Sequence, residues 1–290
     1  MLAVLFAALA GALFGALAVA VRSGLRRGGD PEVGALVVAG VALLASALLA
    51  TPSAVVGGVR PGDLWPFLLA GALVPGASQI LFILAVRDAG PSRAAILIGT
   101  APLISVLIAL TLLGEPFRPL LLVATALIVA GGAALARERA RPEDFRALGV
   151  VLALTCAALF GVRDNIVRWA ARDTHPPPLV AATASLLAAS LVILVYLLVV
   201  RRSVLRSRLR TALPAFAVAG VSLGLAYVSL LEAFDRGRVS IVAPLNATQS
   251  LWAVVFSAVV VGRRSEVISR RLVLAGALVV AGSALIGAVR

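Results

Sequence analysis

Ten long apolar runs make up most of this 290-residue chain. Each run is close to the about 20 residues that a helix needs to cross the hydrocarbon core of a bilayer. Because backbone groups in lipid must find their hydrogen-bond partners within the protein, we expect these runs to be helices. The sequence therefore predicts an all-α integral membrane protein with ten transmembrane helices. The predicted helices occupy about residues 1–21, 33–51, 64–86, 94–113, 119–136, 147–170, 178–200, 211–233, 239–262 and 272–289.

The composition supports lipid as the main solvent of the chain. Only 13% of the residues are charged, about half the share found in a soluble domain. All 26 basic residues are arginine, and most of them lie in the short loops. Basic loops of membrane proteins set orientation and contact anionic lipid, whereas a nucleic-acid site needs a folded basic surface with groups that contact the bases. We therefore expect the lipid bilayer as a partner and no nucleic acid.

Few residues of the chain suit enzymatic chemistry. Cys156 is the single cysteine and lies in an apolar run, and His175 is the single histidine and lies in a proline-rich loop. Neither has the second ligand that a metal site requires. A membrane hydrolase would need a serine–histidine pair, paired aspartates or a metal, and the chain has no phosphate-binding Gly-Lys-Ser/Thr motif. The sequence therefore predicts no enzyme, no cofactor, no metal and no use of ATP.

The two halves of the chain repeat each other. Residues 76–115 align with residues 224–263 at an offset of 148, and nine of these forty positions are identical, more than the composition gives by chance. Two similar apolar halves are a pattern that transporters use. Each half is predicted to hold five helices, an odd number, so the second half enters the membrane in the opposite orientation. We expect two inverted five-helix repeats, at residues 1–140 and 141–290.

The arginines are divided unevenly between the two sets of loops. The loops that follow helices 1, 3, 5, 7 and 9 hold 18 arginines, whereas the other loops and the C-terminus hold 7. An excess of positive charge in short loops marks the cytoplasmic side. The pattern predicts a multi-pass protein of the cell membrane, plasma or inner, with both termini outside.

Several short elements of the chain resemble the EamA-type, ten-helix branch of the drug/metabolite transporter superfamily. An Ala-Leu-Phe-Gly element lies early in each half, at residues 12–15 and 158–161. A block at residues 85–115 ends in Leu-Gly-Glu. A closing helix reads Ala-Leu-Ile-Val-Ala-Gly at residues 126–131 and Ala-Leu-Val-Val-Ala-Gly at residues 277–282. The predicted orientation departs from this resemblance, because members generally keep both termini in the cytoplasm.

The resemblance implies a function. Members of this superfamily are secondary transporters, so we expect a small metabolite such as an amino acid to be moved outward, by alternating access and without ATP. A flippase for lipids or lipid carriers is the alternative, because small relatives in the superfamily act on lipid carriers. Protons are the candidate coupling ion, and both a monomer and a homodimer are compatible with the sequence.

Polar side chains inside the predicted helices are candidate substrate-binding residues. Such side chains are costly in lipid and tend to face the bundle interior or a water-filled path. Asn246 and Gln249 share one face of the ninth helix, and Gln79 and Tyr227 occupy equivalent positions in the two repeats. We expect all four to face a central cavity. The alternative for each is a hydrogen bond between packed helices.

The sixth helix carries a group of charged and polar residues. Arg163 and Asn165 are predicted to bind the substrate, with the Arg163 cation facing an anionic or carboxylate group. The alternative is that the long side chain of Arg163 reaches out to the membrane surface. Asp164 lies four residues before Arg168, in the favourable order for an ion pair, and is the candidate titrating group for proton coupling.

Two prolines fall inside predicted helices of the two repeats. Pro102 lies in the fourth helix and Pro244 in the ninth. Because proline removes a backbone hydrogen bond and crowds the preceding turn, we expect each of them to kink its helix.

Overall fold

A computed structural model of the protein describes most of the chain. The described residues are 2–57, 60–112, 119–136, 145–170, 174, 176–236, 242, 245–246, 248–261 and 269–289. Every regular element among these residues is a helix, so the predicted all-α membrane class is confirmed.

Each of the ten predicted segments contains helix. Seven of the segments are described as a single helix each: α1 (Leu2–Arg26), α2 (Pro31–Gly57), α7 (Leu120–Ala136), α8 (Leu148–Ala170), α9 (Pro178–Val200), α10 (Arg202–Arg236) and α13 (Arg270–Val289). The third segment consists of η1 (Pro61–Asp63), α3 (Trp65–Gly71), η2 (Ala72–Ala77) and α4 (Ser78–Ala89), and the fourth consists of α5 (Pro91–Ile98) and α6 (Ala101–Leu112). The ninth segment includes α12 (Gln249–Phe256) and η3 (Ser257–Val261). Among the described residues, five helical stretches are long and apolar enough, by length and composition alone, to cross a membrane: α1, α2, the third segment, α9 and α10.

Local sequence explains where several helices begin and end. The side chain of Asp30 accepts hydrogen bonds from the backbone N–H groups of Glu32 and Val33, each 3.0 Å long, and so caps the start of α2. Proline begins α5 and α9, where a backbone N–H has no partner within the helix in any case. Gly90 joins α4 to α5 with a φ of 88°, a conformation that glycine adopts at little cost.

The start of α10 differs from the prediction. The apolar pattern placed the eighth helix at about 211–233, but α10 begins at Arg202 and runs to Arg236. The apolar pattern marks the part of a helix that suits lipid, and an arginine-rich stretch outside that part can still be helical. The helix therefore extends beyond the predicted span at both ends.

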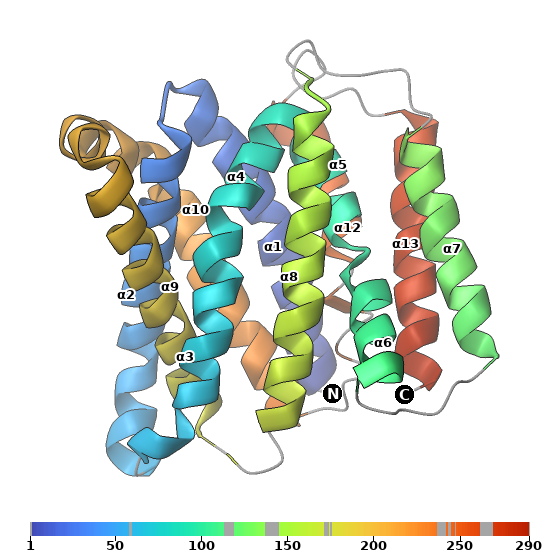
Figure 1. The fold of residues 1–290 in the computed structure, drawn as a ribbon, viewed down its shortest axis with the longest axis horizontal. Coiled ribbons are helices and arrows are strands. Elements are labelled where there is room, and N and C mark those ends of the chain that lie inside the picture. The colour runs from blue at the N-terminus through green and yellow to red at the C-terminus, as the bar shows by residue number, and fades with distance from the viewer. Residues whose placement is uncertain are drawn as a thin grey trace.

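Contacts between helices follow a two-fold pattern. α1 packs against α10 and α12, and the equivalent helix of the second repeat, α8, packs against α4 and against α5 and α6. The pairs α2–α9 and α7–α13 join equivalent helices of the two repeats, and Figure 1 shows these two pairs at opposite ends of the bundle. Two inverted five-helix repeats produce such a pattern. Both chain termini lie at one end of the bundle in Figure 1. The proposed boundary between residues 140 and 141 lies outside the described residues and stays a prediction.

Candidate functional site

A cavity lies between the two repeats. Its wall is built by α1, η2, α4 and α5 from the first repeat and by α8, α10 and α12 from the second. The cavity volume is about 30 Å³. A buried water needs roughly 10–15 Å³ of such cavity volume, so the cavity in this conformation has room for about two waters. A metabolite would fit only after the helices around it move apart.

Three of the predicted site residues line this cavity. They are Gln79 on α4, Tyr227 on α10 and Gln249 on α12. Gln79 and Tyr227 come from equivalent positions of the two repeats, so the two-fold pattern brings both side chains to one space. The Nε2 group of Gln79 is buried and has no hydrogen-bond partner among the described residues. A buried amide N–H without a partner costs free energy, which a polar ligand in the cavity would recover.

Tyr227 connects the second repeat to the first. Its hydroxyl donates a hydrogen bond to the backbone carbonyl of Val74, at 2.8 Å, and accepts one from Nη1 of Arg163, at 3.3 Å. Val74 belongs to η2 in the first repeat, and Arg163 belongs to α8 in the second. The hydroxyl is therefore a junction between three helical segments at the cavity wall.

The distortion of the third segment explains why the Val74 carbonyl is available. Val74 has an extended backbone, with φ of −139° and ψ of 115°, inside the π-helical turn η2. The backbone N–H of Ser78 consequently bonds to the carbonyls of Leu73 and Pro75 and passes over that of Val74. Pro75 has no N–H of its own to contribute to the helical pattern. Tyr227 therefore provides a partner for a carbonyl that the N–H of Ser78, four residues further on, does not use.

Arg163 is held directly behind the wall. It is 8% exposed, and its guanidinium lies 5.4 Å from the ring centre of Phe160 and 5.9 Å from that of Tyr227. These distances suit cation–π contacts, which stabilise a cation in a place with little water. Both rings line the cavity, whereas Arg163 does not. The cation would meet a solute in the cavity only if one of the two aromatic side chains moved aside.

The other predicted residues lie elsewhere or are not described. Asn165 is buried and donates from Nδ2 to the carbonyl of Gly161, one turn back in its own helix, at 2.8 Å. Asn246 is half-buried and does not line the cavity. The side chain of Asp164 and all of Pro244 lie outside the described residues, so proton coupling and the second kink stay predictions. The substrate-binding roles of Asn165 and Asn246 also stay predictions.

The fourth and ninth segments share an interruption next to the cavity. In the fourth, helix stops after Ile98 and resumes at Ala101, and Pro102 lies in the first turn of α6. The hydroxyl of Thr100 donates to the carbonyl of Leu97, at 2.6 Å. Thr248, its equivalent in the ninth segment, donates in the same way to the carbonyl of Leu245, at 2.5 Å. The repeat therefore extends to individual hydrogen bonds.

Sequence reasoning missed the aromatic part of the wall. Phe14, Phe82 and Phe160 all line the cavity. Phe14 and Phe160 are the phenylalanines of the two Ala-Leu-Phe-Gly elements, so they are equivalent residues of the two repeats. That equivalence is a usable signal, because the same repeat pairs Gln79 with Tyr227.

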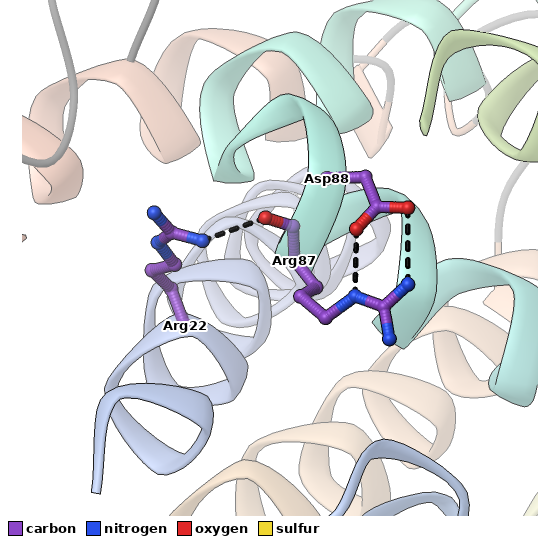
Figure 2. A network of polar contacts seen from close by, with 3 residues as sticks. All are labelled: Arg22, Arg87 and Asp88. Atoms are coloured by element: carbon purple, nitrogen blue, oxygen red, sulfur yellow. Dashed lines mark hydrogen bonds and ion pairs between the residues drawn. The ribbon is translucent and has the colours of Figure 1, made fainter. Parts of the chain in front are cut away.

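A network of polar contacts joins helix ends at the arginine-rich end of the bundle. Figure 2 shows Nη1 of Arg22, on α1, donating to the backbone carbonyl of Arg87, on α4, at 2.7 Å. The guanidinium of Arg87 in turn bonds both carboxylate oxygens of Asp88, at 2.6 and 3.1 Å. The backbone N–H of Arg146, just before α8, donates to the carbonyl of Asp88, at 2.7 Å. Helices that line the cavity are thus tied together at this end.

Comparison with known proteins assigns the family. The sequence model of the EamA-like transporter family matches residues 1–136 and 147–288. The chain belongs to the EamA-like transporter family. This family is part of the drug/metabolite transporter superfamily, which confirms the resemblance drawn from the sequence.

The structural comparison agrees with this fold. A crystal structure of a protein is similar with a TM-score of 0.66 and 22% sequence identity, over 98% of this chain and 95% of that chain. At this identity the similarity shows the fold alone. The comparison with curated proteins found no match. Members of the EamA-like family are membrane transporters, so this chain is a multi-pass membrane protein in contact with the lipid bilayer.

Proposed function

We propose that this protein is a secondary transporter that moves a small carboxylate-bearing metabolite, such as an amino acid, out of the cell by alternating access and without ATP. The observation that carries the proposal is the cavity between the two repeats, with hydrogen-bond donors on and behind its wall. A binding site at the interface of inverted repeats is accessible from either side when one repeat rocks against the other.

The polar groups around the cavity favour an acceptor-rich substrate. Gln79 offers an amide N–H₂ that no described residue accepts from, and Arg163 can only donate. A carboxylate accepts hydrogen bonds at both oxygens and is attracted to the guanidinium. Phe14, Phe82 and Phe160 would contact an apolar part of the same molecule. A small amphipathic acid combines these features.

Arg163 is proposed to act late in substrate binding. It lies behind Tyr227 and Phe160, so the substrate carboxylate would replace the Tyr227 hydroxyl as its acceptor. The hydroxyl that is released is the one bonded to Val74 in η2. Substrate binding would in this way change a contact of the distorted turn in the third segment, where the helix already departs from regular geometry.

The remaining features of the proposal come from the sequence. The arginine distribution supports a cell-membrane protein with both termini outside. Asp164 is the proposed proton-coupling residue. The protein is proposed to act as a monomer or a homodimer.

The direct test starts with finding the substrate. Extracellular metabolite pools of overproducing and deletion cells are compared, and enriched acids are then assayed for counterflow in liposomes that contain the purified protein. We expect uptake of at least one amphipathic acid. If liposomes instead move a fluorescent phospholipid between leaflets and no soluble metabolite, the protein is a flippase and the proposal is wrong.

The role of Arg163 is tested with the acid and its uncharged amide. Wild-type protein is expected to prefer the acid by about tenfold or more, because a hydrogen bond to a charged group contributes roughly 1.5–3 kcal/mol. Arg163→Ala is expected to lose this preference. Arg60→Ala removes an exposed arginine that does not line the cavity and is the matched control, expected to keep the preference. An Arg163→Ala protein that folds and still prefers the acid to the same degree would exclude carboxylate recognition by this side chain.

A further inference from the structure

α10 is longer than a helix needs to be to cross the hydrocarbon core of a membrane, and the excess length is its first three turns. α10 has 35 residues and is about 52 Å long at about 1.5 Å per residue. The hydrocarbon core is only about 30 Å thick. Pro214 lies within the helix, where it removes a backbone hydrogen bond and favours a bend. In Figure 1 the start of α10, in gold, is seen end-on, so it runs across the direction of the neighbouring helices.

This stretch, residues 202–213, is called the arginine segment below, and it has two distinct faces. Leu205 and Ala212 are buried in the main hydrophobic core, so one face is fixed to the protein. Arg202, Arg206 and Arg210 are exposed and follow one another at intervals of four residues, which places them along one stripe of the helix. An amphipathic helix of this kind lies in the interface between lipid and water.

Apolar side chains accompany the arginine stripe. Leu209 is 41% exposed and Leu213 is 52% exposed. An exposed arginine stripe alone would suit any soluble anion. Arginines with exposed leucines between and beside them suit a molecule that has an anionic headgroup and an acyl chain.

The arginine segment is joined to a second basic segment. Phe216, one turn further along α10, fills the space beside Gly24 and Gly34, where an added Cβ would lie 2.8 and 2.6 Å from its ring atoms. These glycines flank the turn between α1 and α2, which carries the exposed Arg26 and Arg27. The fold thus brings together arginines that are far apart in the chain.

Two carboxylates at the start of α2 already have partners. The arginine segment contains no acidic residue. Asp30 caps the start of α2 with its side chain. Glu32 forms an ion pair with Arg201, at 3.3 Å. Both carboxylates are thus engaged with groups outside the stripe.

We propose that the arginine segment, together with the turn between α1 and α2, is a binding surface for the headgroups of anionic phospholipids. The arginines contact headgroup phosphates, and Leu209 and Leu213 contact the acyl chains below them. Binding there holds the start of α10 in the membrane interface. The proposal is independent of the transported substrate.

The test titrates short-chain phosphatidylglycerol into the purified protein in neutral detergent and follows bound lipid by native mass spectrometry. Each arginine near an anionic surface strengthens binding about fivefold. The variant R206Q/R210Q is expected to raise the apparent Kd for phosphatidylglycerol at least fivefold and to leave that for phosphatidylcholine unchanged. The matched control R270Q/R271Q removes two exposed arginines from the start of α13 and is expected to change neither Kd by more than about twofold.

A lysine variant and soluble phosphate competitors distinguish an effect of charge from misfolding, and a lipid from a soluble phosphate. R206K/R210K keeps the charge and is expected to retain most of the binding, which shows that any loss in the glutamine variant is electrostatic. Unchanged phosphatidylglycerol binding by R206Q/R210Q, or an equal loss in R270Q/R271Q, would overturn the proposal. Glycerol phosphate or inorganic phosphate that displaces the lipid at equal concentration would also overturn it, because the surface would then bind a soluble phosphate without the acyl chain.

Discussion

At the scale of single residues, the hydroxyl of Tyr227 holds two contacts at once. It donates to the Val74 carbonyl in one repeat and accepts from Arg163 in the other. One atom therefore links the cation behind the cavity wall to the backbone of η2. Gln79, at the equivalent position of the first repeat, has the opposite property, since its buried Nε2 has no partner among the described residues.

Removing the Tyr227 hydroxyl tests this link. Tyr227→Phe keeps the ring but deprives Val74 of its donor, so the free energy of unfolding is expected to fall by about 1–3 kcal/mol. Transport is expected to fall as well, because the hydroxyl that connects Arg163 to η2 is gone. Thermal unfolding and counterflow assays measure the two effects. Tyr196→Phe, the same change on α9 away from the cavity, is the control and should transport normally.

Replacing Gln79 should separate stability from binding. Gln79→Leu removes a buried N–H₂ that has no partner in the described part of the chain, so stability is expected to be unchanged or slightly higher. Substrate affinity is expected to fall about tenfold, because the donor toward the ligand is lost. Thermal midpoints and the transport KM check this pair of results. A variant that is less stable but transports normally would show that Gln79 is a packing residue.

At the scale of elements, the interruptions of the third, fourth and ninth segments lie around the cavity. η2 frees the Val74 carbonyl, and the breaks at Thr100 and Thr248 are closed by equivalent hydroxyl bonds. In a regular helix most carbonyls already accept a hydrogen bond from the backbone of the same helix. The irregular turns therefore add polar contacts between the two repeats to those that regular helices make, such as the bond from Ser222 on α10 to the Leu13 carbonyl on α1.

Close helix contact is the second property at this scale, and glycine makes it possible. A Cβ added to Gly15 on α1 would lie 2.6 Å from Cβ of Trp252 on α12, so Gly15→Ala is expected to destabilise the protein by about 1–3 kcal/mol. Gly40 on α2 has nothing within 4 Å of an added Cβ, so Gly40→Ala is expected to stabilise it by up to about 1 kcal/mol. Thermal unfolding in one detergent compares the two. Equal midpoints would contradict tight packing of α1 on α12.

At the scale of the whole molecule, orientation follows from the arginines. We expect Ser207→Cys, in the arginine segment, to react with an impermeant maleimide only after cells are permeabilised. Gly62→Cys, an exposed position at the other set of loops, is expected to react in intact cells. Both cysteines are introduced into a protein that also carries Cys156→Ser, although Cys156 is buried and should contribute little labelling signal. The reverse pattern of labelling would place both termini in the cytoplasm.

The class of fold, the ten segments and the family can be predicted from the amino-acid sequence, because long apolar runs and a repeat at a constant offset are properties of the chain alone. The repeat also pairs Gln79 with Tyr227, which predicts that both side chains face one space. Which polar residues line the cavity depends on tertiary packing. Gln249 lines it, whereas Asn165 bonds within its own helix, although both are polar residues of apolar segments. The direction of a side chain depends on how its helix is rotated against neighbours far away in the sequence. The Tyr227–Val74 bond, which joins residues 153 positions apart, exists only after that packing is complete.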